Sequence, residues 1–280
     1  MREDLAIIAS TSQHQFVKDA QGEVEKFLNY VEVLPEQYEW RDMELGAFRR
    51  LMHETPPRMD AYWHHMCNHL AAYVFVTLSK GQELVRETVE ALNKNRVLPA
   101  AACCRSLFET SAMFLCEIGD MEATYRNLVV ELGENAIRER LRTGTGFVAS
   151  SEMEEHLWRL THGTRIRDLV EEGYPEQMGA SKYIKRLTEC WKWLFTRYQE
   201  LCDLAHPSLI SNAVFCSRQV DDPHTGEKIR TLVRGGKEHL GLWQLELILA
   251  PLCWSGIVLH KGSVLALSLQ ESIRDLFCSP

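Results

Sequence analysis

The amino-acid sequence predicts an all-α protein, a helical bundle of six to eight helices with one small β-hairpin near residues 213–233. Three observations predict this fold. Apolar residues recur at helical spacing through most of the 280 residues. Hydrophobic residues make up 45% of the chain and charged residues 25%, as in ordinary globular proteins. Only one pair of short segments has the composition of strands around a turn.

The length of the chain allows one large helical domain or a main domain with a helical extension. The segment before the Pro56-Pro57 pair has weaker periodicity after its first helix, and two adjacent prolines end any helix that reaches them. We therefore predict an N-terminal helical extension over residues 1–57 and a main helical bundle domain over residues 58–280.

Four helices are expected in the first half of the chain. Pro99 falls in the first turn of one of them, where its missing N–H costs no hydrogen bond. Gly144 and Gly146 form a loop that ends another. The expected helices span about residues 12–33, 59–93, 98–118 and 120–142.

The second half of the chain is predicted to contain four further helices and the hairpin. The most regular amphipathic pattern lies between Ser181, an N-cap candidate, and Pro207, which ends the helix. Two strand-like segments flank the sequence DDPHTGE, whose Asp, Pro and Gly favour a turn. The expected helices span about residues 151–172, 181–205, 240–259 and 263–277, and the expected strands span residues 213–220 and 228–233.

The segment from Leu240 to Leu259 is long enough to cross a bilayer and carries a single charge, Glu246. Gln244, Glu246 and Pro251 interrupt it, and no basic cluster flanks it to set a topology. A helix that is apolar on all sides is also what the centre of a large bundle requires. We interpret it as a buried core helix.

Net charge and cysteine usage narrow the class of protein. The net charge of -8 disfavours a general nucleic-acid surface, because such a surface neutralises many phosphates. The nine cysteines are scattered, with no C-x-x-C motif and no secretory leader before them, which is typical of reduced thiols. We therefore predict a cytoplasmic protein.

The helix expected over residues 98–118 is apolar on most sides but carries Arg105 and Glu109. Burying an unpaired charge costs several kcal/mol, so the two side chains are expected to pair across one helical turn. Two interpretations remain open for this pair. It is either an internal ion pair that ties helices together or part of a ligand-binding or catalytic pocket.

A second polar candidate is the helix end that precedes Pro207. His206 lies at the negative end of the helix dipole, which favours the protonated imidazole. Asp203 could orient or charge that imidazole, and Ser208 follows the proline. A Ser-His-Asp triad is not favoured, because a hydroxyl two residues away across a proline is poorly placed to meet the imidazole. Structural capping is the alternative interpretation.

A third candidate is the histidine-rich stretch WHHMCNHL, residues Trp63 to Leu70. His65 and His69 are four residues apart, which places two imidazoles on the same helix face, as H-x-x-x-H metal sites require. Met66 stands where the helical zinc-protease signature has Glu, so further ligands would have to come from other helices. The alternative is a pair of hydrogen-bonded histidines at the edge of the core. The additional ligand candidates are Glu109, Asp203, His206 and Glu246.

Two short motifs support a family resemblance. RSLFET (Arg105 to Thr110) and YQELCDLAHPS (Tyr198 to Ser208) resemble an uncharacterised, mostly bacterial all-helical family with an Arg-Ser-Leu-x-Glu helix and a His-Pro-Ser helix end. The likeness spans roughly Met59 to Leu259. It implies that Arg105, Glu109 and His206 meet in one polar site.

A more distant likeness is to HEPN-type helical domains, many of which are metal-independent RNases. Their signature is an arginine followed, after four to six residues, by a histidine on one helix. This likeness implies an RNase in which arginine holds phosphate and histidine acts as acid or base. The matching spacings here run from Arg58 to His64 or His65, from Arg218 to His224 and from Arg234 to His239.

The leading functional prediction is an intracellular helical binding or interaction module, regulatory or defence-associated, with an internal polar site. The first alternative is a HEPN-like metal-independent RNase, and the second is a metal-dependent helical-bundle enzyme that uses His65 and His69. We expect a homodimer, an unknown small-molecule or protein partner, RNA only under the first alternative, no membrane association and no cofactor under the leading prediction. The residues predicted for the polar site are Arg105, Glu109, Asp203, His206 and Ser208.

Overall fold

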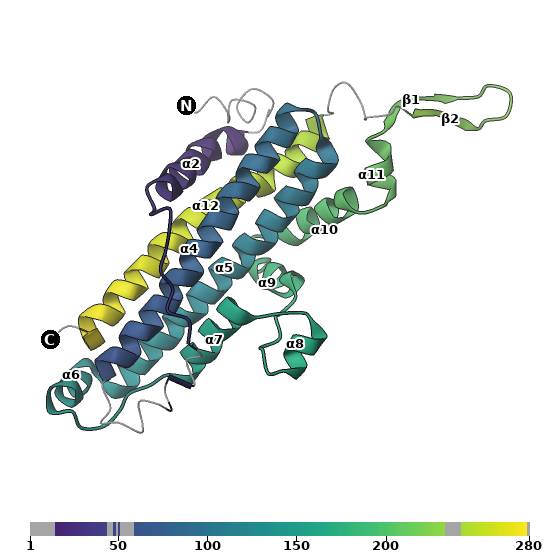
Figure 1. Ribbon diagram of the computed structural model, residues 1–280. Helices are drawn as coiled ribbons and strands as arrows, with labels where there is room; N and C mark the ends of the chain where they lie inside the picture. The colour runs from purple at the N-terminus through teal and green to yellow at the C-terminus, as the bar shows by residue number, and fades with distance from the viewer. Residues whose placement is uncertain (1–14, 44–46, 49, 51–58, 233–241, 279–280) are drawn as a thin grey trace. The chain divides into compact units, whose positions relative to one another are not determined.

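The computed structural model describes residues 15–43, 47–48, 50, 59–232 and 242–278. It is 74% helical, with 10 helices and a single two-stranded antiparallel sheet among these residues. This confirms the predicted all-α bundle with a small β-hairpin (Figure 1). The number of helices exceeds the predicted six to eight, because two expected helices are each broken into two and one short helix was not expected, whereas the last two expected helices are joined into one.

The described residues form two compact units, and three of the five boundaries between the units fall inside long helices. These helices are α4 (Met59–Asn93), α5 (Val97–Leu132) and α12 (Leu242–Ile273). The extension predicted at residues 1–57 stays a prediction. Unit 1 takes described residues from Met1–Val33, Lys80–Met113 and Ala180–His260, and unit 2 takes those from Leu34–Ser79, Phe114–Gly179 and Lys261–Pro280.

Unit 1 is built around segments of α4, α5 and α12 in close contact. A Cβ atom at Gly81 of α4 would lie 2.6 Å from Leu259 of α12, so the two helices approach closely there. The Cys104 thiol of α5 donates to the carbonyl oxygen of Ile248 of α12 at 3.3 Å. The other elements of unit 1 are α2 (Gln15–Glu32), α9 (Ala180–Leu187), α10 (Leu194–Ala205), α11 (Leu209–Ala213), β1 (Cys216–Asp221) and β2 (Lys228–Leu232).

Unit 2 packs the remaining segments of the same three helices. A Cβ atom at Gly262 of α12 would lie 2.7 Å from the ring of Phe114 of α5. The ring of Trp63 in α4 stacks on Phe277, with 4.1 Å between ring centroids. Its other elements are α6 (Glu134–Thr143), α7 (Ser151–His162), α8 (Arg167–Glu171) and a π-helical turn (Arg274–Cys278).

The helices expected over residues 98–118 and 120–142 are one helix, α5, followed by α6. Gly119 lies inside α5, since glycine weakens a helix without ending it unless the backbone must change conformation. The change occurs at Gly133, whose φ of 75° is in the left-handed region. The predicted end of this helix, at residue 118, was therefore wrong, because α5 continues to Leu132.

Two other expected helices are broken. The helix expected at residues 151–172 ends at Gly163, where a Cβ atom would lie 2.2 Å from the carbonyl oxygen of Arg159. The helix expected from Ser181 to Ala205 is divided into α9 and α10, and Ser181 lies inside α9 rather than at its N-cap. The sequence pattern does not reveal this break, because Leu187 before it and Leu194 after it are both buried.

The hairpin agrees with the prediction, with Val220 directly opposite Ile229 in the antiparallel pair. Its expected last residue, Val233, lies outside the described residues. The two C-terminal helices expected before and after residue 260 are one helix, α12, with Pro251 inside it.

By length and composition, one helical segment of the described chain could cross a membrane, Leu245–Cys278, whose most apolar 18-residue window has a mean hydropathy of 1.4. In the structure, 61% of its most apolar window is buried, as in the central helix of a bundle.

Candidate functional site

A polar cluster joins α5 and α10 in unit 1. The Arg105 Nε atom donates to Glu109 Oε1 at 3.0 Å, across one turn of α5. From α10, the Tyr198 hydroxyl donates to the same carboxylate oxygen at 2.9 Å. The Arg105 Nη1 atom lies 2.5 Å from Nε2 of His206, which follows α10. The structure therefore brings together Arg105, Glu109 and His206, and adds Tyr198.

Helix geometry explains why these side chains meet. Arg105 and Glu109 are four residues apart on α5, and Tyr198, Cys202 and His206 follow the same spacing along α10. His206 is the C-cap residue, with extended backbone angles, and its N–H donates to the Cys202 carbonyl oxygen. Pro207 then prevents the helix from continuing, because the residue before a proline disfavours helical angles. Three leucines anchor α10 by their burial (Leu194, Leu201 and Leu204).

The cluster is less buried than we predicted. The side chains of Arg105 and Glu109 are 26% and 27% exposed, so the site lies at the edge of unit 1 rather than inside it. The helix pattern misled the prediction, because alanine counts as apolar but tolerates water. Ala102, one turn before Arg105, is exposed.

The electrostatics of the cluster depend on the ion pair. Burial is the largest single effect and lowers the pKa of the Arg105 guanidinium, but the charge and hydrogen bond of Glu109, together with Cys202 and Tyr198, outweigh it, so the net pKa is raised. Burial and the negative charge of Glu109 raise the pKa of Tyr198 to about 12. Burial also raises the pKa of the Cys202 thiol, although the nearby Arg105 opposes it. Tyr198 therefore stays a hydroxyl donor and Cys202 stays a neutral thiol at neutral pH.

The contact between Arg105 and His206 defines the state of the imidazole. A guanidinium has only N–H donors, so Nε2 of His206 must accept the hydrogen bond. The imidazole in this contact is therefore neutral, with its proton on Nδ1. The helix dipole favours the protonated form, which could not accept this hydrogen bond.

Two predicted site residues lie outside the cluster. Asp203 is exposed, and no hydrogen bond among the described residues joins its carboxylate to His206. Ser208 is the N-cap of α11, where its hydroxyl accepts from the Ser211 N–H at 3.1 Å. The same hydroxyl donates to the backbone carbonyl oxygen of Asp203. Ser208 thus has the capping role that was the alternative interpretation of this helix end.

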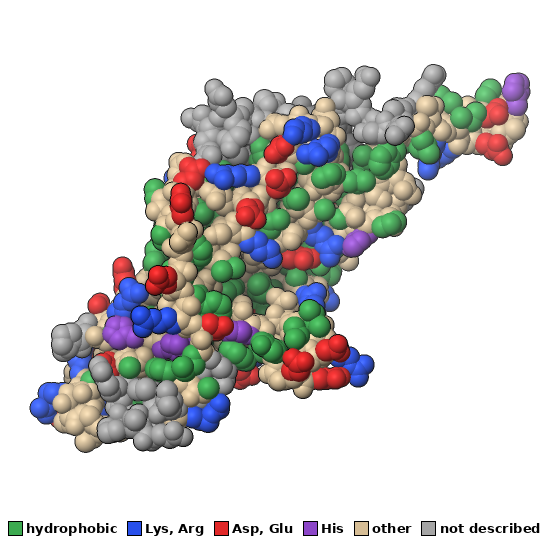
Figure 2. Space-filling model, in the orientation of Figure 1, with side chains coloured by type: hydrophobic (Ala, Val, Ile, Leu, Met, Phe, Trp, Pro, Cys, Tyr) green, Lys and Arg blue, Asp and Glu red, His purple; other side chains and the backbone are tan. Residues whose placement is uncertain are grey.

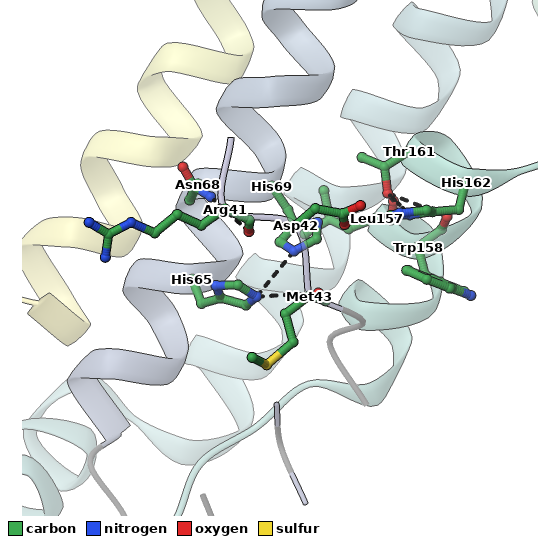
Figure 3. A network of polar contacts seen from close by, with 10 residues as sticks. All are labelled: Arg41, Asp42, Met43, His65, Asn68, His69, Leu157, Trp158, Thr161 and His162. Atoms are coloured by element: carbon green, nitrogen blue, oxygen red, sulfur yellow. Dashed lines mark hydrogen bonds and ion pairs between the residues drawn. The ribbon is translucent and has the colours of Figure 1, made fainter. Parts of the chain in front are cut away.

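Two histidines of α4, His65 and His69, lie in unit 2, in the network that Figure 3 shows. His69 is fully buried, and its Nε2 atom lies 3.1 Å from Nε2 of His65. Nε2 of His65 also lies 3.3 Å from the carbonyl oxygen of Met43. On α7, His162 Nε2 lies 3.0 Å from Asp42 Oδ1. No group of three His, Cys, Asp or Glu side chains in the described part of the chain is arranged to hold a metal ion.

The HEPN-type spacings have little support in the described structure. Arg58, Arg234 and His239 lie outside the described residues, as does the side chain of Arg218. His224 is exposed in the hairpin turn, where its backbone N–H donates to Asp222. His64 is exposed on α4.

Sequence reasoning missed two features. Tyr198 was placed in the amphipathic pattern and in the family motif but not in the polar site, although its four-residue spacing to Cys202 and His206 could have placed it in the cluster. In unit 2, buried Glu117 of α5 lies 2.8 Å from Nδ1 of His156 of α7. These two residues are 39 positions apart, and nothing in the local pattern connects them.

Comparisons with protein-family models, curated proteins and solved structures give no match for this chain. The two family resemblances therefore stay predictions.

Proposed function

We propose that this protein is a helical binding module and that the cluster of Arg105, Glu109, Tyr198 and His206 binds a small molecule through its carboxylate or phosphate group. One observation carries the proposal. The Arg105 guanidinium is held by side chains from two helical elements, yet about a quarter of the side chain (26%) is open to solvent.

The partners of Arg105 orient its guanidinium for recognition of an anion. Nε and Nη1 donate to Glu109 and His206, which leaves the N–H groups of Nη2 for Tyr198 or for an incoming acceptor. A planar guanidinium fork matches the oxygen atoms of carboxylate and phosphate groups. Because the side chain is already ordered, binding loses less conformational entropy than it would at a free surface arginine.

The neutral His206 adds a second donor. With Nε2 occupied by Arg105, the proton on Nδ1 is available at an exposed residue. Glu109 limits the affinity, since its charge balances that of Arg105. The cluster therefore favours a ligand that offers several acceptor atoms over a single simple anion.

Thermal unfolding with added inorganic phosphate tests this proposal. Phosphate is expected to raise the melting temperature of the wild type in a saturable way, because a ligand that binds only the folded state stabilises it. Arg105→Gln is expected to abolish the shift. Arg197→Lys is the matched control, because Arg197 pairs with Glu200 on the same α10 but takes no part in the cluster. Equal shifts in the wild type and both variants would show that phosphate binds elsewhere.

The Arg105–His206 contact also supports the RNase alternative. The guanidinium would hold a phosphate and His206 would act as acid or base. On the face drawn in Figure 2, described basic and acidic side chains are interleaved, so a long RNA would find no broad basic surface there. Cleavage of RNA in the presence of a metal chelator, lost in His206→Ala and retained in His64→Ala, would favour this alternative.

A regulatory or defence-associated role, the cytoplasmic location and the homodimer stay predictions. They are compatible with a binding module and add nothing to the argument for the cluster.

A further inference from the structure

Three atoms with lone pairs face one another in unit 2. They are Nε2 of His65, Nε2 of His69 and the backbone carbonyl oxygen of Met43 (Figure 3). The two nitrogen atoms are 3.1 Å apart, and the oxygen lies 3.3 Å from the nitrogen of His65. The Met43 carbonyl oxygen is also a hydrogen-bond acceptor for the His69 imidazole. The helix supplies the two imidazoles, and the segment before α4 supplies the carbonyl.

Hydrogen bonding alone satisfies this arrangement poorly. The two rings meet through the same atom, Nε2, and the side chain of His69 is fully buried. Two protonated Nε2 atoms would repel each other, and a carbonyl oxygen carries no proton. At most one N–H therefore serves the other two atoms.

A cation at this position would be held by all three lone pairs. Asp42 adds a negative charge that acts on both His65 and His69. Its carboxylate is half exposed and lies 3.0 Å from His162, so it contributes to the field without being one of the three atoms. The negative charge of Asp42 thus attracts a cation at this position.

We propose that His65, His69 and the Met43 carbonyl oxygen bind one divalent first-row transition-metal ion. Bonds of about 2.0–2.1 Å from a metal to imidazole nitrogen place two neighbouring ligands roughly 2.8–3.4 Å apart. The observed 3.1 Å falls within this range. Imidazole nitrogen and carbonyl oxygen together suit Ni²⁺ and Zn²⁺.

The donor set also defines the kind of site. Because no third His, Cys, Asp or Glu side chain joins it among the described residues, the remaining coordination positions belong to water or to an incoming ligand. Met43 is 42% exposed. This is an open metal site, separate from the cluster around Arg105.

Calorimetric titration of the full chain with NiCl₂ tests the proposal. The wild type is expected to bind one Ni²⁺ ion, and His65→Gln and His69→Gln are expected to weaken the dissociation constant at least about tenfold, as loss of a metal-binding group does. His64→Gln is the matched control, because His64 is a neighbouring but exposed histidine of the same helix. It is expected to bind as the wild type does.

His69 is fully buried, so circular dichroism and the melting temperature of each variant without metal show whether it remains folded. His65 is only partly buried, and its variant keeps the test valid if His69→Gln unfolds. The proposal is wrong if the wild type does not bind Ni²⁺, if His65→Gln binds as tightly as the wild type, or if His64→Gln weakens binding equally. The phosphate response of Arg105 is measured separately, so failure of one proposal leaves the other standing.

Discussion

Two of the ion pairs of helix α5 lie in different surroundings. In unit 1, Arg105 and Glu109 lie on the same helix and are 26% and 27% exposed. In unit 2, Glu117 pairs with His156 of α7, and their side chains are only 1% and 17% exposed. The first pair is local and accessible to solvent, whereas the second joins two helices inside the protein.

This difference separates a binding role from a structural role. A partly exposed pair gains little free energy from its attraction, because water screens both charges. A buried pair depends on its partner, because removing one member leaves the other desolvated. We therefore expect substitutions at His156 to affect stability and substitutions at Arg105 to affect binding.

The largest expected effect is that of His156→Leu. Buried Glu117 would lose its His156 partner, and the free energy of unfolding is expected to fall by about 3 kcal/mol, measured by urea denaturation. Arg159→Leu on the same helix is the control, since its partner Glu155 is 73% exposed and the expected loss is below about 1 kcal/mol. Similar losses in both variants would contradict the distinction between buried and exposed pairs.

The second effect is a pH dependence of the same pair. The hydrogen bond to Glu117 raises the pKa of His156 above its ordinary value of 6.5, despite the opposing effect of burial. Arg159 lowers this pKa slightly and Asp120 raises it. Protonated His156 is the form that the fold favours, so its contribution is fully present below pH 6.5 and is lost as the pH rises through the raised pKa.

The measurement is the difference in melting temperature between the wild type and His156→Gln as a function of pH. The difference is expected to shrink as the pH rises above neutrality. A difference that stays constant or grows over that range would mean that the charge on His156 does not stabilise the fold.

The smallest effect on stability is expected for Arg105→Lys. Lysine keeps the positive charge beside Glu109 but lacks the planar fork that reaches Glu109 through Nε and His206 through Nη1. The free energy of unfolding is expected to change by less than about 1 kcal/mol. Thermal or urea unfolding measures it, and a loss as large as that of His156→Leu would make the Arg105 pair a structural element.

Much of the fold follows from local patterns. The helical periodicity predicted α4 with its observed bounds, and turn residues predicted the hairpin. The same patterns failed at the break after Leu187, because Leu187 and Leu194 are buried on both sides of it and continue the stripe. They also failed after His162, where Gly163 ends α7 and no residue of α8 is buried. They also divided α5 at Gly119, where no change of backbone conformation is needed.

The amino-acid sequence alone determined the helical class of this protein and the spacing that puts Arg105 beside Glu109 and His65 beside His69, because contacts within one helix depend only on its period. Folding determined the rest. The approach of α10 to α5 placed Tyr198 and His206 beside Arg105 and Glu109. The packing of α7 on α5 placed His156 beside Glu117. Such contacts depend on how helices distant in the sequence pack together. The same packing decides how exposed each ion pair is, and this exposure distinguishes the Arg105 site from the buried Glu117 pair.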